Sequence, residues 1–137
     1  MNLFFDSSAW AKRYIEESGS DRVEDFCRQA HSVSLSILCV PEVISAFARL
    51  KRQNMITRAQ FDQAKKALFK EIEDIRLINI TPDVISHSVT LLQRYHLRTL
   101  DALHLACAAE SNMDHFITSD IRQKEAATQY GFDVIWV

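Results

Sequence analysis

Short apolar runs recur along the chain and alternate with longer stretches in which apolar residues follow helical spacing. Runs of this length, bounded by polar residues, are typical of strands buried in a sheet. We therefore predict five strands, at Leu3–Phe5, Ser34–Leu38, Leu77–Ile80, His115–Thr118 and Asp133–Val137.

Helix start signals mark three of the stretches between these strands. Ser20 follows a polar turn and precedes apolar residues at helical spacing, so it is a predicted N-cap. Thr57 and Gln60 match the capping-box pattern ahead of a second helix. Thr81 is a predicted N-cap, followed by Pro82 in the first helical turn.

The segment Asp101–Glu110 also shows helical spacing, and its apolar face is rich in alanine. Small side chains on one face let a sheet or another helix approach closely. This segment is therefore predicted to be a core helix.

The alternation of strands and helices favours an α/β fold. No hairpin signal such as Asn-Gly joins neighbouring strands, which favours a parallel sheet. We expect a central parallel sheet of four to five strands with helices on both faces. The chain has 137 residues, two glycines, two prolines and no repeat or low-complexity tract, so residues 1–137 are predicted to form a single domain.

Charge and cysteine content narrow the functional classes. Sixteen basic and eighteen acidic residues give a net charge of −2, so any contact with nucleic acid has to be local. The three cysteines, Cys27, Cys39 and Cys107, show no CxxC spacing, which favours reduced thiols in a cytoplasm. No secretion signal and no apolar stretch of ~18 residues is evident, so we expect no membrane association.

Acidic residues follow predicted strands or open predicted helices. Asp6 directly follows the first strand and Asp120 follows the fourth, which assigns both to the carboxyl edge of the sheet, where such folds bind ligands. Glu42 lies in the first turn of the helix after the second strand, and Asp101 opens the alanine-rich helix. These four side chains are therefore candidates for one site.

Four carboxylates at one edge favour a bound cation. At a separation of ~4 Å and an effective dielectric near ~20, two carboxylates repel by about 4 kcal/mol, which a divalent ion offsets. Oxygen ligands suit Mg²⁺ or Mn²⁺, whereas Zn²⁺ prefers histidine and cysteine ligands at close spacing, which this chain lacks. Taken singly, each acid is better explained by helix capping, because caps are common, so spacing alone suggests the site without requiring it.

Longer motifs contain the same acids. They are FFDSSAWAKRYIEESGS at Phe4–Ser20, LRTLDALHLA at Leu97–Ala106 and ITSD at Ile117–Asp120, together with the helix start at Val40–Glu42. In this order the motifs resemble the PIN-domain ribonucleases, specifically the VapC-like toxins of bacterial type II toxin–antitoxin pairs, over essentially the full length of the chain.

The resemblance implies a PIN-like fold and a metal-dependent endoribonuclease. It implies that Asp6, Glu42, Asp101 and Asp120 are catalytic and bind one or two Mg²⁺ or Mn²⁺ ions, with hydroxyl support from the residues Ser8 and Thr118. It also implies an RNA substrate, products with 5′-phosphate and 3′-hydroxyl ends, a cognate antitoxin and a homodimer. The chain ends directly after the last predicted strand, whereas relatives often continue, so antitoxin contacts made by such a tail stay open.

Basic residues near the acidic motifs are candidate phosphate contacts. They are Lys12, Arg13, Arg98 and Arg122. The alternative is that they are ordinary solvated charges. A further basic run, Arg49–Arg52, falls at a predicted helix C-terminus, where the helix macrodipole alone accounts for cations.

His104 and Cys107 lie on the same alanine-rich helix as Asp101. We interpret both as packed, hydrogen-bonded core residues, because no second cluster of ligands accompanies them. Phe4, Phe5 and the other phenylalanines at core spacing are likewise interpreted as packing residues and not as base-stacking platforms.

Two other functions stay open. The chain could be a PIN-like interaction module with negligible turnover that acts within an antitoxin–DNA complex, or the same metal site could act on DNA flaps or small phosphodiesters. The apolar stripe of the predicted helix at Thr57–Asp74 suits either a homodimer interface or the core of the monomer.

Overall fold

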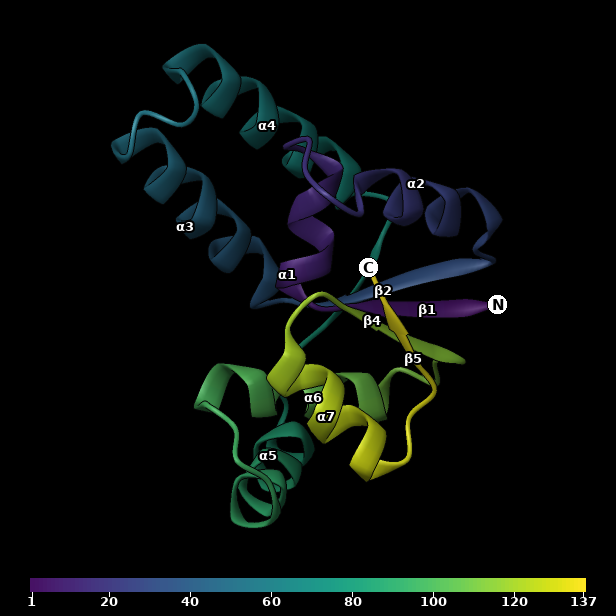
Figure 1. The fold of residues 1–137 in the computed structure, drawn as a ribbon. Helices are drawn as coiled ribbons and strands as arrows, with labels where there is room; N and C mark the ends of the chain where they lie inside the picture. The colour runs from purple at the N-terminus through teal and green to yellow at the C-terminus, as the bar shows by residue number, and fades with distance from the viewer.

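A five-stranded parallel sheet crosses the centre of the computed structural model, which describes residues 1–137 (Figure 1). The strand order is β3-β2-β1-β4-β5, and every neighbouring pair is parallel. This confirms the predicted α/β fold and its parallel sheet. The strands are β1 (Asn2–Phe5), β2 (Ser32–Ser36), β3 (Arg76–Ile78), β4 (His115–Thr118) and β5 (Val134–Trp136).

Helices cover both faces of the sheet, as predicted. In Figure 1, α1 to α4 lie on one side and α5 to α7 on the other. No helix is both long and apolar enough to cross a membrane. The helices are α1 (Ser7–Trp10), which continues as a 3₁₀ turn η1 (Ala11–Arg13), α2 (Ser20–Gln29), α3 (Cys39–Arg52), α4 (Arg58–Glu71), α5 (Pro82–Arg94), α6 (Thr99–Glu110) and α7 (Ile121–Tyr130).

Alternating side chains of the central strands supply two separate hydrophobic cores. Leu3 and Phe5 of β1 pack beneath α1 to α4, together with Ile117 of β4. Phe4 and Phe116 point the opposite way and pack against the alanine-rich face of α6 and against α5 and α7. Because both faces are buried, the central strands read as continuous apolar runs in the sequence.

Two strands lie earlier in the sequence than predicted. β2 ends at Ser36 because α3 begins at Cys39, so Ile37 and Leu38 form the connection into that helix. β3 ends at Ile78, two residues before the predicted end of the third strand. Apolar side chains in the connections therefore extended the predicted strands past their hydrogen-bonded ends.

The predicted helix starts at Thr57 and Thr81 are confirmed, but the prediction for Ser20 is wrong by one residue. Thr57 forms a full capping box with Gln60, and Thr81 caps α5. The N-cap of α2 is Gly19, whose φ of +93° suits glycine. The Ser20 hydroxyl instead accepts a hydrogen bond from the Glu17 N–H and donates one to the Lys12 carbonyl.

The capping box of α4 gives a stability prediction. Thr57→Ala removes the hydroxyl that accepts a hydrogen bond from the Gln60 N–H at 3.1 Å. We expect the free energy of unfolding to fall by about 1 kcal/mol in urea denaturation. Thr57→Ser retains the hydroxyl and should unfold near the wild-type midpoint. Equal midpoints for the alanine variant and the wild type would contradict this role of the cap.

Candidate active site

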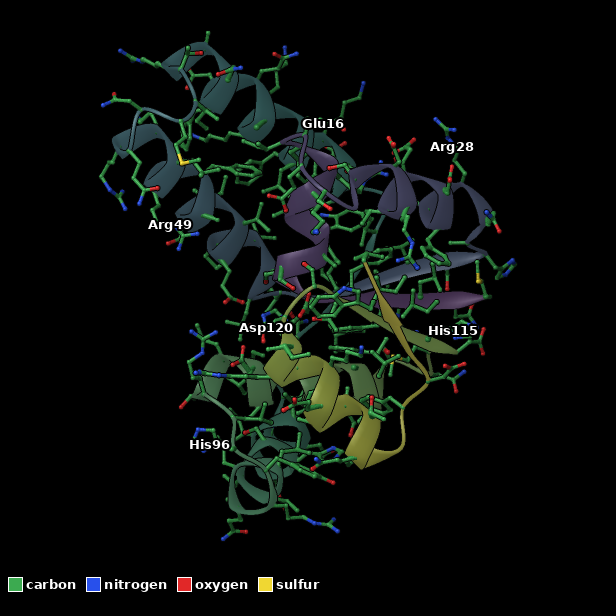
Figure 2. The ribbon with its side chains drawn as sticks, in the orientation of Figure 1. Glu16, Arg28, Arg49, His96, His115 and Asp120 are labelled. Carbon is green, nitrogen blue, oxygen red and sulfur yellow. The ribbon has the colours of Figure 1, made fainter.

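The four predicted acids come from two adjacent strand ends and two helix starts. Asp6 follows β1 and caps α1, while Asp120 follows β4 and caps α7. Glu42 and Asp101 lie in the first turns of α3 and α6. Since β1 and β4 are neighbours in the sheet, Asp6 and Asp120 share its carboxyl edge. Figure 2 shows Asp120 at this edge, between the two helical layers.

Asp6 is the most deeply buried of the four acids, with 2% of its surface exposed. Its Oδ1 accepts hydrogen bonds from the Ser8 hydroxyl at 2.7 Å and from the Ala9 N–H at 3.0 Å. Its Oδ2 accepts one from the Thr118 hydroxyl at 2.5 Å. Burial raises the pKa of Asp6 above its ordinary value, although these hydrogen bonds act in the opposite direction. The carboxylate is thus firmly oriented yet costly to ionise.

The hydroxyls of Ser8 and Thr118 join Asp6 to the loop that carries Asp120. The Ser8 oxygen also accepts a hydrogen bond from the Ser119 N–H at 3.1 Å. The Thr118 oxygen also accepts one from the Asp120 N–H at 3.0 Å. Each hydroxyl therefore donates to the Asp6 carboxylate and accepts from a backbone N–H of the segment that carries Asp120. These bonds fix the separation of the ends of β1 and β4.

Arg98 lies between Asp101 and Asp120. Its Nε is 3.1 Å from Oδ2 of Asp101, and its Nη2 is 3.7 Å from Oδ2 of Asp120. These bonds and the nearby charges, including that of Glu42, raise the pKa of Arg98. The guanidinium remains 68% exposed, so it neutralises the acids without being enclosed by them.

Sequence reasoning missed the partners of Glu42, which are Ser7 and His104. The Ser7 hydroxyl donates to Oε1 of Glu42 at 2.9 Å, and Nε2 of His104 contacts the same oxygen. Burial raises the pKa of Glu42, but the hydrogen bond and charge of His104 outweigh it and hold the pKa below its ordinary value. The available signals were the position of Ser7 beside Asp6 and the three-residue spacing of His104 from Asp101.

His104 itself is 2% exposed and hydrogen-bonded, which confirms its interpretation as a packed residue. That interpretation did not foresee that its partner is an acid of the site. Cys107 is buried too, but its thiol donates to the Ser36 hydroxyl at 3.5 Å, and it makes no bond to any of the four acids.

Two of the four candidate phosphate contacts have other partners in the structure. Lys12 donates to the carbonyl of Val137, and Arg13 forms ion pairs with Glu24 and Glu71. Val137 follows β5, so Lys12 lies near the carboxyl edge but is bonded to a backbone carbonyl there, whereas Arg13 is held by acids of α2 and α4. Arg98 and Arg122, in contrast, line one pocket together with Asp120.

The donor set at this edge fits a hard divalent cation. The four acids offer carboxylate oxygens only, which suits Mg²⁺ or Mn²⁺. No three acidic, histidine or cysteine side chains are arranged as a ready-made set of ligands. Glu42 faces His104, and the Arg98 guanidinium lies between Asp101 and Asp120. The guanidinium of Arg98 thus occupies the space between these two acids that a metal ion shared by them would take.

Comparison with known proteins gives a consistent assignment. The family model for the PIN domain matches residues 3–129. Ribonuclease VapC46 of Mycobacterium tuberculosis is 33% identical over 138 residues, which cover 97% of this chain and 95% of that protein. The solved structure of VapC20 from the same species, described as a sarcin-ricin loop cleaving toxin, has a TM-score of 0.69, 17% identity and 95% coverage of both chains.

A chain of a toxin–antitoxin complex from Klebsiella pneumoniae has a TM-score of 0.66, 20% identity and 88% coverage of both chains. At such identities the two structures establish a shared fold and confirm that the sheet and its helices are PIN-like. Because the family model spans nearly the whole sequence and a VapC ribonuclease aligns along almost all of it, this chain belongs to the PIN-domain family, among relatives of the VapC type.

Proposed function

We propose that this protein is a metal-dependent endoribonuclease and the toxin of a type II toxin–antitoxin pair. The observation that carries the proposal is the Asp6 carboxylate, which is buried and held by two hydroxyls at the sheet edge that also carries Asp120. The similarity of this chain to Ribonuclease VapC46 supports hydrolysis of RNA. The products expected from this chemistry have 5′-phosphate and 3′-hydroxyl ends.

The residues of the site have distinct tasks in this proposal. Bound Mg²⁺ or Mn²⁺, as one ion or two, supplies Lewis-acid chemistry that lowers the pKa of water and offsets negative charge at the scissile phosphate. Asp6, Glu42, Asp101 and Asp120 would hold it. Ser8 and Thr118 keep both oxygens of Asp6 oriented, and His104 keeps Glu42 ionised. A site prepared in this way needs little reorganisation when RNA arrives.

Arg98 is the proposed phosphate contact nearest to the acids. With a divalent ion held by Asp101 and Asp120, the exposed guanidinium of Arg98 would be free to turn toward an incoming phosphate. Arg122, which follows Asp120 at the start of α7, is a second exposed candidate.

The proposal also includes an antitoxin partner, a homodimer and a cytoplasmic location. A solved structure with this fold is a toxin–antitoxin complex, which supports the first. The apolar stripe of α4 belongs to the core of the monomer, because Ala64 and Leu68 are buried. Ile85, Val89 and Leu92 of α5 are exposed at helical spacing and are better candidates for a dimer interface. Three free cysteines support a reducing compartment.

The main alternative is an interaction module with negligible turnover. Such a module would need Asp6 only as the cap of α1, a task that asparagine performs without the cost of a buried charge. The structure of the acidic edge therefore favours catalysis.

Cleavage of RNA by the purified protein tests the proposed activity. Asp6→Asn removes one charge from the site while keeping the size of the side chain, so we expect the cleavage rate to fall by at least ~100-fold. EDTA should abolish wild-type cleavage, and Mg²⁺ or Mn²⁺ should restore it. Asp25→Asn, at an exposed acid on α2, is the matched control and should cleave normally. If the wild type, Asp6→Asn and Asp25→Asn all fail to cleave RNA, and calorimetry detects no metal binding, the interaction module would be favoured.

The raised pKa of Asp6 predicts a pH dependence of stability. A carboxyl group whose pKa is higher in the folded state stabilises that state only while it is protonated. Metal-free wild type should therefore lose stability relative to Asp6→Asn as the pH rises through that raised pKa. Urea unfolding in EDTA from about pH 4 to about pH 8 measures this difference. Parallel stability curves for the two proteins would show that ionised Asp6 carries no cost.

The role of Arg98 is tested by RNA binding. Arg98→Ala should weaken binding and lower the slope of log K against log salt by about 0.7 to 1, the value for one phosphate contact. Arg28→Ala, in the last turn of α2 and away from Asp120 in Figure 2, is the control for loss of one charge. An unchanged slope in Arg98→Ala would remove Arg98 from the RNA site.

A further inference from the structure

Positive charge is concentrated in the hairpin formed by α3 and α4. Residues 49–70 contain seven basic residues and one acidic residue, a net charge of +6. The remainder of the chain contains nine basic and seventeen acidic residues, a net charge of −8. A protein with a net charge of −2 thus has one strongly basic arm. Its cations are Arg49, Lys51, Arg52, Arg58, Lys65, Lys66 and Lys70.

None of these seven cations forms an ion pair, whereas Lys12, Arg13, Arg28 and Arg98 all do. Lys51 lies over the ring of Phe61, and the other six side chains are exposed. The helix macrodipole suits Arg49 and Arg52 at the end of α3, but it disfavours a cation such as Arg58 in the first turn of α4. Helix electrostatics alone therefore does not account for the arm.

The solvent face of α3 connects this arm to the acids. Glu42, Ser45, Arg49 and Arg52 are separated by three, four and three residues, which places them along one side of the helix. The first three also line one groove together with Arg98. Figure 2 shows Arg49 on the side of α3 that is turned away from α4. Arg49 is about 10 Å and Arg52 about 15 Å from Glu42 along the helix axis.

We propose that this face of α3, formed by Ser45, Arg49 and Arg52, is a track for the RNA backbone that leads from the acidic cluster toward the α3–α4 turn. The inference rests on the proposed ribonuclease function and names the surface that holds the substrate beyond the scissile bond. Arg49 and Arg52 bind phosphates of the flanking nucleotides, and the Ser45 hydroxyl lies between them and the cleavage site. RNA is favoured over an acidic peptide or an anionic membrane because the track begins at Glu42.

Charge-matched double variants separate a defined track from a diffuse field. RNA binding is measured by fluorescence anisotropy with a labelled single-stranded RNA and a labelled RNA hairpin, in EDTA, so that no cleavage is required. Arg49→Gln with Arg52→Gln should weaken binding at least about tenfold and lower the salt slope by about 1.4, as for two single-strand phosphate contacts. Lys66→Gln with Lys70→Gln removes the same charge from exposed positions of α4 and should change affinity less than about twofold.

Two further measurements test whether any loss of binding comes from lost charge and not from a damaged helix. Arg49→Lys with Arg52→Lys keeps both charges and should restore most of the binding, while thermal unfolding checks that α3 is intact in every variant. Equal weakening by both glutamine pairs, or an unchanged salt slope in the α3 pair, would overturn the track. The track would also be overturned if RNA did not bind through Arg49 and Arg52 while phosphatidylglycerol vesicles or a polyglutamate peptide did.

Failure of the track and failure of the ribonuclease are distinguishable. If metal-dependent cleavage occurs but the α3 pair leaves RNA affinity and kcat/KM unchanged, the track is wrong and the activity stands. If RNA binding depends on Arg49 and Arg52 but no RNA is cleaved with any metal ion, the track stands as a binding surface and the proposed activity is wrong.

Discussion

The buried carboxylate of Asp6 and the hydroxyls of Ser8 and Thr118 set the geometry on which the rest of the site depends. Asp6 accepts a hydrogen bond from each hydroxyl, and each hydroxyl accepts one from the backbone that leads to Asp120. The ends of β1 and β4 are thereby joined by side chains as well as by the sheet. Burial raises the pKa of this carboxylate, so the geometry carries an electrostatic cost that the hydrogen bonds offset only in part.

Cationic side chains of the protein reduce that cost at the outer acids. His104 lies against Glu42, and Arg98 lies between Asp101 and Asp120, so three of the four carboxylates have a partner that is cationic or can become so. Asp6 has hydroxyl and N–H donors instead. A buried acid without a counter-ion, next to acids whose arginine partner is largely exposed, is an arrangement that a divalent ion would stabilise.

The sequence was sufficient where local chemistry decides the structure. Asp6 and Asp120 were predictable because an acid directly after a buried strand belongs at the sheet edge, and Thr57 because its capping box is complete within four residues. It was insufficient where the partner is distant in the chain. His104 meets Glu42 across 62 positions, and Arg13 meets Glu71 across 58, so no local pattern records either contact. The shift of the α2 cap from Ser20 to Gly19 has the same origin, because the Ser20 hydroxyl bonds the Lys12 carbonyl.

Segregation of charge would let a protein with a net charge of −2 bind its proposed RNA substrate. Screening at physiological salt limits electrostatic attraction to about 8 Å, so a phosphate responds to its neighbourhood and not to the total charge. At the acids that neighbourhood is repulsive until a cation is bound. At Arg49, about 10 Å further along α3, the acids are largely screened and the arginine dominates. The proposal therefore assigns affinity for the strand and cleavage of it to separate groups. The interpretation of Arg49–Arg52 as partners of the helix dipole considered α3 alone, whereas residues 49–70 together have a net charge of +6.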